Sequence, residues 1–102
     1  MFVNKPDVIY ITSIFTYDYK HVKNSVQFYR QLFPRAKIFL GGLCATLIPQ
    51  YFENLGLDMI HKSILSHVED MTLDYSLHPQ IKQSIMFTHR GCVRKCPWCC
   101  VH

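Results

Sequence analysis

Three cysteines stand close together near the end of this 102-residue chain, at positions 92, 96 and 99. Three residues separate Cys92 from Cys96, and two residues separate Cys96 from Cys99. Thiolate sulfur is the ligand that iron-sulfur clusters require, and gaps of this length let one loop surround a compact cluster. A four-iron cluster has four corners, so three cysteines leave one iron open to a small molecule. The spacing therefore predicts an iron-sulfur site with Cys92, Cys96 and Cys99 as ligands.

The run that contains these cysteines resembles the cluster motif of the radical S-adenosylmethionine (radical SAM) superfamily, and it reads Thr88-His89-Arg90-Gly91-Cys92-Val93-Arg94-Lys95-Cys96-Pro97-Trp98-Cys99. It is especially similar to members with an N-terminal cobalamin-binding-like domain. The resemblance implies that the three cysteines hold a 4Fe-4S cluster and that S-adenosylmethionine chelates the fourth iron. It also implies that an electron from the cluster cleaves this cofactor to a 5'-deoxyadenosyl radical, with Trp98 near the adenine.

The length of the chain limits what the resemblance implies. A barrel of repeated strand-helix units needs on the order of 200 residues or more, whereas the cysteine run already lies at the end of 102 residues. We therefore expect the front part of a radical enzyme, incomplete as an isolated chain, with a separate chain as a candidate for the rest of the barrel. The expected parts are a partial cobalamin-binding-like α/β domain over 1–66, a linker over 67–83, and the first strand and cluster loop of a truncated barrel over 84–102.

Strand and helix patterns alternate along the first two thirds of the chain. Residues 7–15 are rich in β-branched and aromatic side chains, as in a buried parallel strand. Apolar residues then recur at helical spacing and form one stripe that ends before Pro34; they are Val22, Val26, Tyr29 and Phe33. A second strand is predicted over 36–40, a helix from about Ala45 to Leu55, and a short third strand over 58–61.

This order predicts an α/β fold: a partial, Rossmann-like parallel sheet with flanking helices that cover both faces. A linker follows, and a strand over 84–88 is expected to lead into the cysteine loop. Gly56 suits the left-handed position after the second helix. Gly41 and Gly42 form a tight turn or, as the alternative, let backbone amides approach a cofactor at the carboxyl edge of the sheet.

A structural zinc site is the alternative interpretation of the cysteine run, with Cys100, His102 or His89 as the fourth ligand. Zinc sites usually take two ligands from each of two separated clusters, and the sequence has no second pair of cysteines, so the iron-sulfur interpretation is favoured. A loop that binds no metal stays open. The second function class is thus a small non-catalytic α/β binding module or remnant, whose loop holds zinc or nothing.

The roles of Trp98 and of a cobalamin site each have an alternative interpretation. Trp98 is either a stacking partner for adenine or an ordinary packing or exposed aromatic residue. Histidine-ligated cobalamin is unsupported, because the segment from Asp58 to Ser63 lacks the spacing and the glycine of the family's Asp-x-His-x-x-Gly pattern. Cobalamin bound without a protein ligand stays open. Cys44 is interpreted as a small buried hydrophobic residue.

Composition and charge limit the compartment and the binding partners that we expect for this chain. Close to half of the residues are apolar and 18% are charged, as in a packed intracellular domain. No apolar run approaches the roughly 20 residues that cross a bilayer, and no signal-peptide pattern opens the chain, so we expect a cytoplasmic protein without membrane contact. The net charge of +4 is too small and dispersed for nucleic acid. Arg90, Arg94 and Lys95 beside the cysteines suit an acidic electron donor such as a flavodoxin, with ordinary solvated charges as the alternative.

Overall fold

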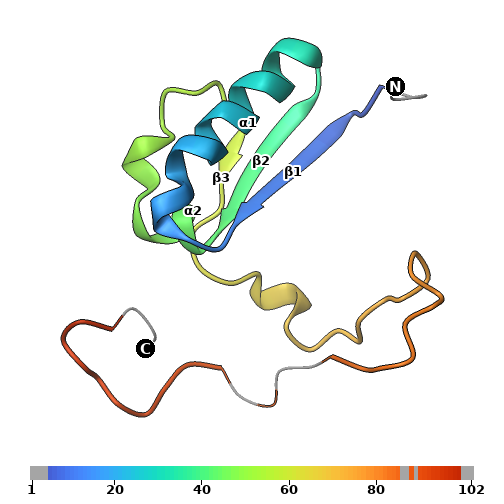
Figure 1. The fold of residues 1–102 in the computed structure, drawn as a ribbon, viewed down its shortest axis with the longest axis vertical. Helices are drawn as coiled ribbons and strands as arrows, with labels where there is room; N and C mark the ends of the chain where they lie inside the picture. The colour runs from blue at the N-terminus through green and yellow to red at the C-terminus, as the bar shows by residue number, and fades with distance from the viewer. Residues whose placement is uncertain (1–4, 86–87, 89, 100–102) are drawn as a thin grey trace. The chain divides into compact units, whose positions relative to one another are not determined.

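The computed structural model describes residues 5–85, 88 and 90–99, and it divides the chain into two units, Met1–Glu69 and Asp70–His102. The first unit contains all of the described helices and strands (Figure 1). They are β1 (Val8–Ser13), α1 (Tyr19–Leu32), β2 (Lys37–Gly42), α2 (Leu43–Leu47) and β3 (Met59–Ile60), with single 3-10 turns at Thr16–Asp18, Pro49–Tyr51 and Ser66–Val68.

The three strands form one parallel sheet in the order β1-β2-β3. Val8 lies opposite Lys37 in the β1–β2 pair, and Leu40 lies opposite Ile60 in the β2–β3 pair. Parallel neighbours require a crossover connection, which α1 supplies for the first pair and α2 with its following turn supplies for the second. The predicted α/β class with a parallel sheet is confirmed.

Helix α1 carries the predicted apolar stripe. Val22 and Val26 are buried, and Tyr29 and Phe33 are half-buried beside them. The helix ends at Leu32, two residues before Pro34, and the Phe33 amide still donates to the Tyr29 carbonyl at 2.9 Å. Apolar residues at steps of three and four lie on one face of a helix, so burial of this stripe is what holds α1 against the sheet.

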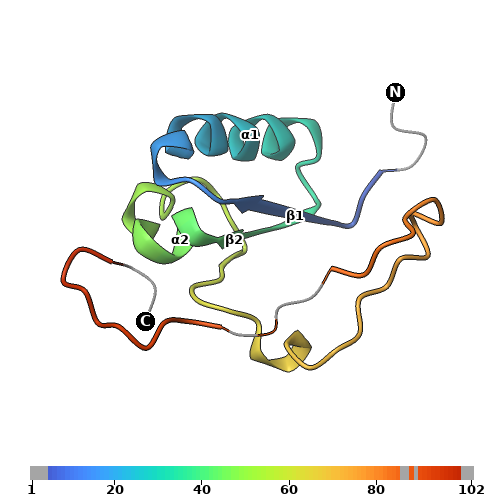
Figure 2. The same cartoon turned by 60° about the horizontal axis from the view of Figure 1, so that its bottom comes forward.

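The prediction that helices cover both faces of the sheet is wrong for the described part of the first unit. Val22 of α1 and Cys44 of α2 belong to one buried cluster around Leu40, so both helices pack on the same face, and Figure 2 shows α1 lying along this face. Two right-handed crossovers that advance in one direction must lie on one side of a sheet. The opposite face carries Tyr10, which is 79% exposed and packs on Phe39 at a ring-centroid distance of 5.4 Å.

The second helix is much shorter than predicted. It ends at Leu47, and a separate 3-10 turn begins at Pro49. Proline disfavours helical backbone in the residue before it, and Ile48 accordingly leaves the helical region with φ −133° and ψ 49°. Phe52, just after the turn, is fully buried in the cluster around Leu40. The expected left-handed conformation of Gly56 is confirmed, at φ +69°.

The Arg30 side chain of α1 forms hydrogen bonds to the segments that precede β2 and β3. Its guanidinium donates to the Ala36 carbonyl at 2.8 Å, the Gly56 carbonyl at 2.6 Å and the Asp58 carboxylate at 2.7 Å. Asp58 also accepts the Ile38 amide at 2.8 Å. The hydrogen bond from the Ile38 amide and, next, that from Arg30 hold the pKa of Asp58 below its usual range, because both favour the charged carboxylate.

The described residues of the second unit form turns and contain no helix or strand. The Tyr75 hydroxyl accepts a hydrogen bond from the Ile85 amide at 2.8 Å, which closes the loop between these two residues. Ser84, Ile85 and Thr88 lie outside any strand, and Met86 and Phe87 fall outside the described residues, so the strand predicted over 84–88 stays a prediction. Among the helices of the described ranges, none has the length and apolar content that a bilayer crossing requires.

Candidate functional site

The last two cysteines of the run lie at the two ends of one β-turn. The Cys99 amide donates to the Cys96 carbonyl at 3.1 Å, with Pro97 and Trp98 as the central residues. Proline fixes its own φ near the value that the second residue of common turns requires, so the sequence favours this turn. The turn brings the backbones of Cys96 and Cys99 within about 7 Å of each other.

Cys92 lies outside this turn, in the preceding irregular stretch. Gly91 before it has φ +79°, and the Arg94 amide donates to the Cys92 sulfur at 3.5 Å. Cys92 is exposed, whereas Cys96 and Cys99 are half-buried, and none of the three is in a disulfide. In the ranges that the structure describes, no three Cys, His, Asp or Glu side chains gather in a group that could hold a metal ion. The predicted ligands therefore share one loop, but the structure does not bring their sulfurs around a common centre.

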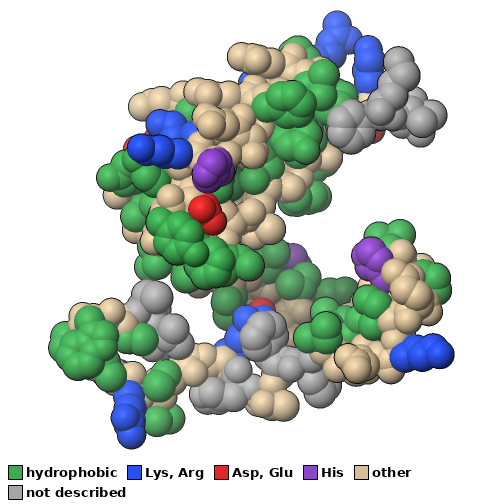
Figure 3. Space-filling view, viewed as in Figure 1, with side chains coloured by type: hydrophobic (Ala, Val, Ile, Leu, Met, Phe, Trp, Pro, Cys, Tyr) green, Lys and Arg blue, Asp and Glu red, His purple; other side chains and the backbone are tan. Residues whose placement is uncertain are grey.

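Trp98 is 86% exposed, so it is not a packing residue of the described part of the chain. Val93, Arg94 and Lys95 are also exposed, and Figure 3 shows solvent-exposed hydrophobic side chains on the second unit. The zinc alternative cannot be built from the described residues, because His89, Cys100 and His102 lie outside them. Thiols are the donor type that an iron-sulfur cluster requires, and three of them lie in this loop.

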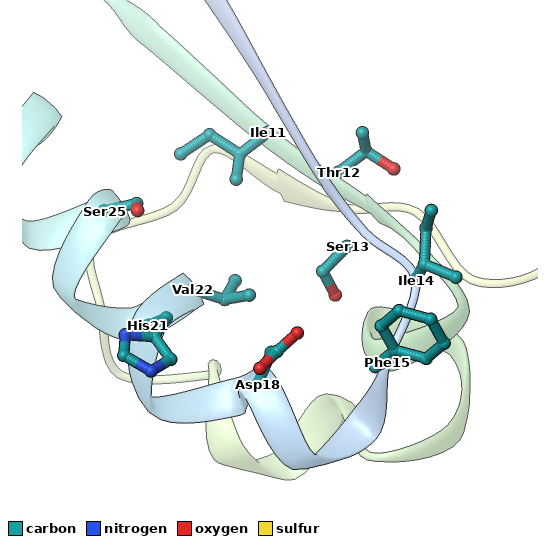
Figure 4. A pocket seen from close by; sticks show the side chains of 9 residues that line it. All are labelled: Ile11, Thr12, Ser13, Ile14, Phe15, Asp18, His21, Val22 and Ser25. Atoms are coloured by element: carbon teal, nitrogen blue, oxygen red, sulfur yellow. The ribbon is translucent and has the colours of Figure 1, made fainter.

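A second feature that could bind a ligand lies in the first unit, at the carboxyl end of β1. A hollow of about 430 Å³ opens there between the strand and the start of α1, and Figure 4 shows its lining side chains. The polar ones are Thr12, Ser13, Asp18, His21 and Ser25, and Ile11 and Val22 are among the apolar ones. Ligands of open α/β folds bind at the carboxyl ends of the strands, which is where this hollow lies.

Ser13 is the notable residue of this hollow. Its side chain is only 8% exposed, and its Oγ has no hydrogen-bond partner among the described atoms. A buried hydroxyl without a partner is unfavourable by about 1–3 kcal/mol. Sequence reasoning missed Ser13, although a hydroxyl side chain at the carboxyl end of an apolar strand is a usable signal for a site at a sheet edge.

Gly42 has a structural requirement for glycine that its neighbour Gly41 lacks. Gly42 has φ +92° and ψ −175°, and a Cβ atom there would overlap the Ser13 carbonyl and stand 2.7 Å from the Thr12 hydroxyl. Gly42 therefore allows β1 and β2 to approach closely just where α2 begins. A Cβ at Gly41 would meet nothing nearer than 3.9 Å. The close approach of two strands accounts for Gly42 without a cofactor.

Cys44 is fully buried in the core cluster, as predicted for a small hydrophobic residue. It lies in α2 of the first unit and belongs to neither candidate site.

No family model, curated protein or solved structure matches this chain.

Proposed function

We propose that this chain supplies the iron-sulfur and S-adenosylmethionine binding segment of a radical SAM enzyme. The observation that carries the proposal is the β-turn closed by the Cys96–Cys99 hydrogen bond, because it places the last two cysteines of the three-cysteine run on one tight bend. Ligands at the ends of such a turn reach one small cluster without strain in the backbone between them.

Cys92 completes the set of three thiolates in this proposal. It must move toward the turn, and no helix or strand has to be broken for this movement, because residues 90–95 lie in irregular structure. The exposed loop also lets iron and sulfide enter. Cys92, Cys96 and Cys99 would hold the cluster, which would supply the electron that cleaves S-adenosylmethionine.

Trp98 is the second residue of the proposed site. Its ring, 86% exposed between Cys96 and Cys99, is available to stack on the adenine of the bound cofactor. Arg94 and Lys95 are exposed beside the cysteines, where their charges would favour a cluster of negative net charge and an acidic, flavodoxin-like donor. The remaining barrel strands would come from further sequence, either in a separate chain or beyond this one.

The test is anaerobic reconstitution of the full chain with iron and sulfide, followed by metal analysis and electron paramagnetic resonance of the reduced protein. We expect about four irons per chain and a signal that changes when S-adenosylmethionine is added. Replacement of Cys92, Cys96 and Cys99 together by alanine should abolish iron binding, whereas Cys44→Ala, which removes a thiol outside the loop, should retain it. Stoichiometric iron in the triple variant, or zinc alone in the native chain, would refute the proposal.

A second candidate function is supported by the hollow at β1: a small α/β module that binds a small molecule. Its volume of about 430 Å³ falls in the range of ligand pockets, roughly 300–1,000 Å³, and suits a small ligand or one arm of a larger cofactor such as cobalamin. The unpartnered Ser13 hydroxyl would gain a hydrogen bond from such a ligand. This function does not require the cysteine loop.

Hydroxocobalamin is the probe for this second function, with binding followed by absorbance and by the shift in thermal unfolding. Ser13→Ala should weaken binding about tenfold, since one hydrogen bond to a buried group is lost. The same variant should make the unliganded protein at least as stable as before, because it removes a buried hydroxyl that has no partner among the described atoms. Absence of binding to the native chain, or equal binding by the variant, would remove cobalamin from this hollow.

A further inference from the structure

We infer that Cys96 and Cys99 form a reversible disulfide when no metal occupies them, so that the loop carries a thiol redox switch. The Cys99 amide donates to the Cys96 carbonyl at 3.1 Å, so the two cysteines are the ends of one β-turn. Residues at the ends of a β-turn have Cα atoms less than about 7 Å apart, and disulfides join cysteines whose Cα atoms are about 4.4–6.8 Å apart. The turn thus places the two Cα atoms near the range of separations that a disulfide requires.

Pro97 makes this geometry a property of the local sequence. Its ring fixes one backbone angle of the turn, so the reduced chain samples fewer conformations in which the two thiols are apart. Both cysteines are half-buried, so each keeps part of its surface open to a small oxidant.

Cys92 is the competing partner, and the structure places it differently. It is exposed, and its sulfur accepts the Arg94 amide at 3.5 Å, within its own stretch of the loop. A pairing of Cys92 with either other cysteine would span a part of the loop that the Cys96–Cys99 turn does not close. Cys96 and Cys99, in contrast, are the two ends of one hydrogen-bonded turn.

The oxidant we name is a small disulfide of the glutathione type. One protein thiolate attacks it, which forms a mixed disulfide and releases one small thiol. The other protein thiolate then attacks the protein sulfur of that mixed disulfide, which forms the Cys96–Cys99 bond and releases the second small thiol. The protein loses two electrons and two protons, and the small disulfide is reduced to two thiols.

The functional consequence rests on the proposed function, whereas the disulfide itself does not. Two sulfurs joined to each other cannot act as thiolate ligands, so oxidation would prevent cluster assembly and reduction would permit it. Metal bound to the same sulfurs would in turn protect them from the oxidant.

The experiment uses the full, metal-free chain in a series of glutathione redox buffers, with differential alkylation and peptide mass spectrometry. We expect Cys96 and Cys99 to lose reactivity together and to appear as one cross-linked peptide, with Cys92 still alkylated. Cys92→Ser should form the same link. A link that involves Cys92 or Cys100, or only mixed disulfides with glutathione, would overturn the inference.

Pro97→Ala is the matched variant for the role of the turn. Loss of the restriction at one residue should lower the equilibrium constant for disulfide formation about 2- to 5-fold. An unchanged equilibrium constant would show that the turn at Pro97 does not favour the disulfide.

Iron uptake by the oxidised and the reduced chain separates this inference from the proposed function. Uptake by the reduced chain alone supports both. Equal uptake by both forms refutes the switch, even where the cross-link forms. Absence of uptake in either form, with the cross-link present, refutes the cluster proposal and leaves the redox pair standing.

Discussion

Gly42→Ala should destabilise the α/β unit severely, whereas Gly41→Ala should be tolerated. The two glycines are neighbours at the end of β2, so the pair controls for position and for chemistry. Gly42 has φ +92° with ψ −175°, a combination that only glycine adopts readily and that costs other residues about 1–3 kcal/mol. The new Cβ would also overlap the Ser13 carbonyl, which belongs to the backbone and cannot rotate away.

The overlap must be relieved by moving β1 away from β2, and such overpacking costs about a further 1–3 kcal/mol. The sum is about 2–6 kcal/mol. A unit of about 65 residues has a free energy of unfolding of about 3–10 kcal/mol, so the variant should lose a large part of its stability. At Gly41 the nearest atom is 3.9 Å from the added Cβ, and the change should be within about 1 kcal/mol of neutral.

Urea unfolding followed by circular dichroism measures the difference. With a slope of about 1 kcal/mol per molar for a small domain, the midpoint of Gly42→Ala should fall by about 2 M or more, while that of Gly41→Ala should shift by at most about 1 M. A fall of less than about 0.5 M for Gly42→Ala, or equal falls for both variants, would refute the argument from strand proximity.

Three further predictions concern the same unit. Phe52→Ala should lower the free energy of unfolding by about 3–5 kcal/mol, because Phe52 is fully buried, whereas Phe28→Ala should have little effect because Phe28 is 56% exposed; urea midpoints compare the two. Arg30→Lys should cost about 1–3 kcal/mol, since an ammonium group cannot reproduce the planar set of hydrogen bonds, and a thermal melt that is unchanged would contradict this. Stability should also depend on pH through Asp58: its pKa is lowered in the fold, so its contribution is present above the ordinary value near 3.9 and is lost as the pH falls through the lowered pKa. Asp58→Asn should flatten this acid dependence, and an unaltered acid profile would count against the assignment.

The positions of the elements could be predicted from sequence where the signal is local. The stripe of Val22 and Val26 predicts α1 because helical periodicity is a property of neighbouring residues. The left-handed Gly56 follows in the same way from the turn preference of glycine. The prediction of one long second helix failed because Pro49 was placed inside it, although the backbone restriction before proline ends α2 at Leu47.

At the candidate sites, too, the local features could be predicted from sequence and the long-range ones could not. The cysteine spacing, and with it the proposed cluster ligands, is a pattern of adjacent residues that can be seen in sequence alone. The sequence also determines the turn at Cys96–Cys99, since Pro97 favours it locally. Whether the three sulfurs gather around a metal is not a local property, and spacing could not decide it.

Only the tertiary structure decided the features that join distant parts of the chain. The direction in which the strands follow one another placed both helices on one face of the sheet and left Tyr10 exposed on the other. The approach of β1 to β2 made Gly42 indispensable and enclosed the hydroxyl of Ser13. Arg30 and Asp58 are 28 residues apart, and only folding brings them together, because the energy of such contacts depends on distances in space that no local pattern encodes.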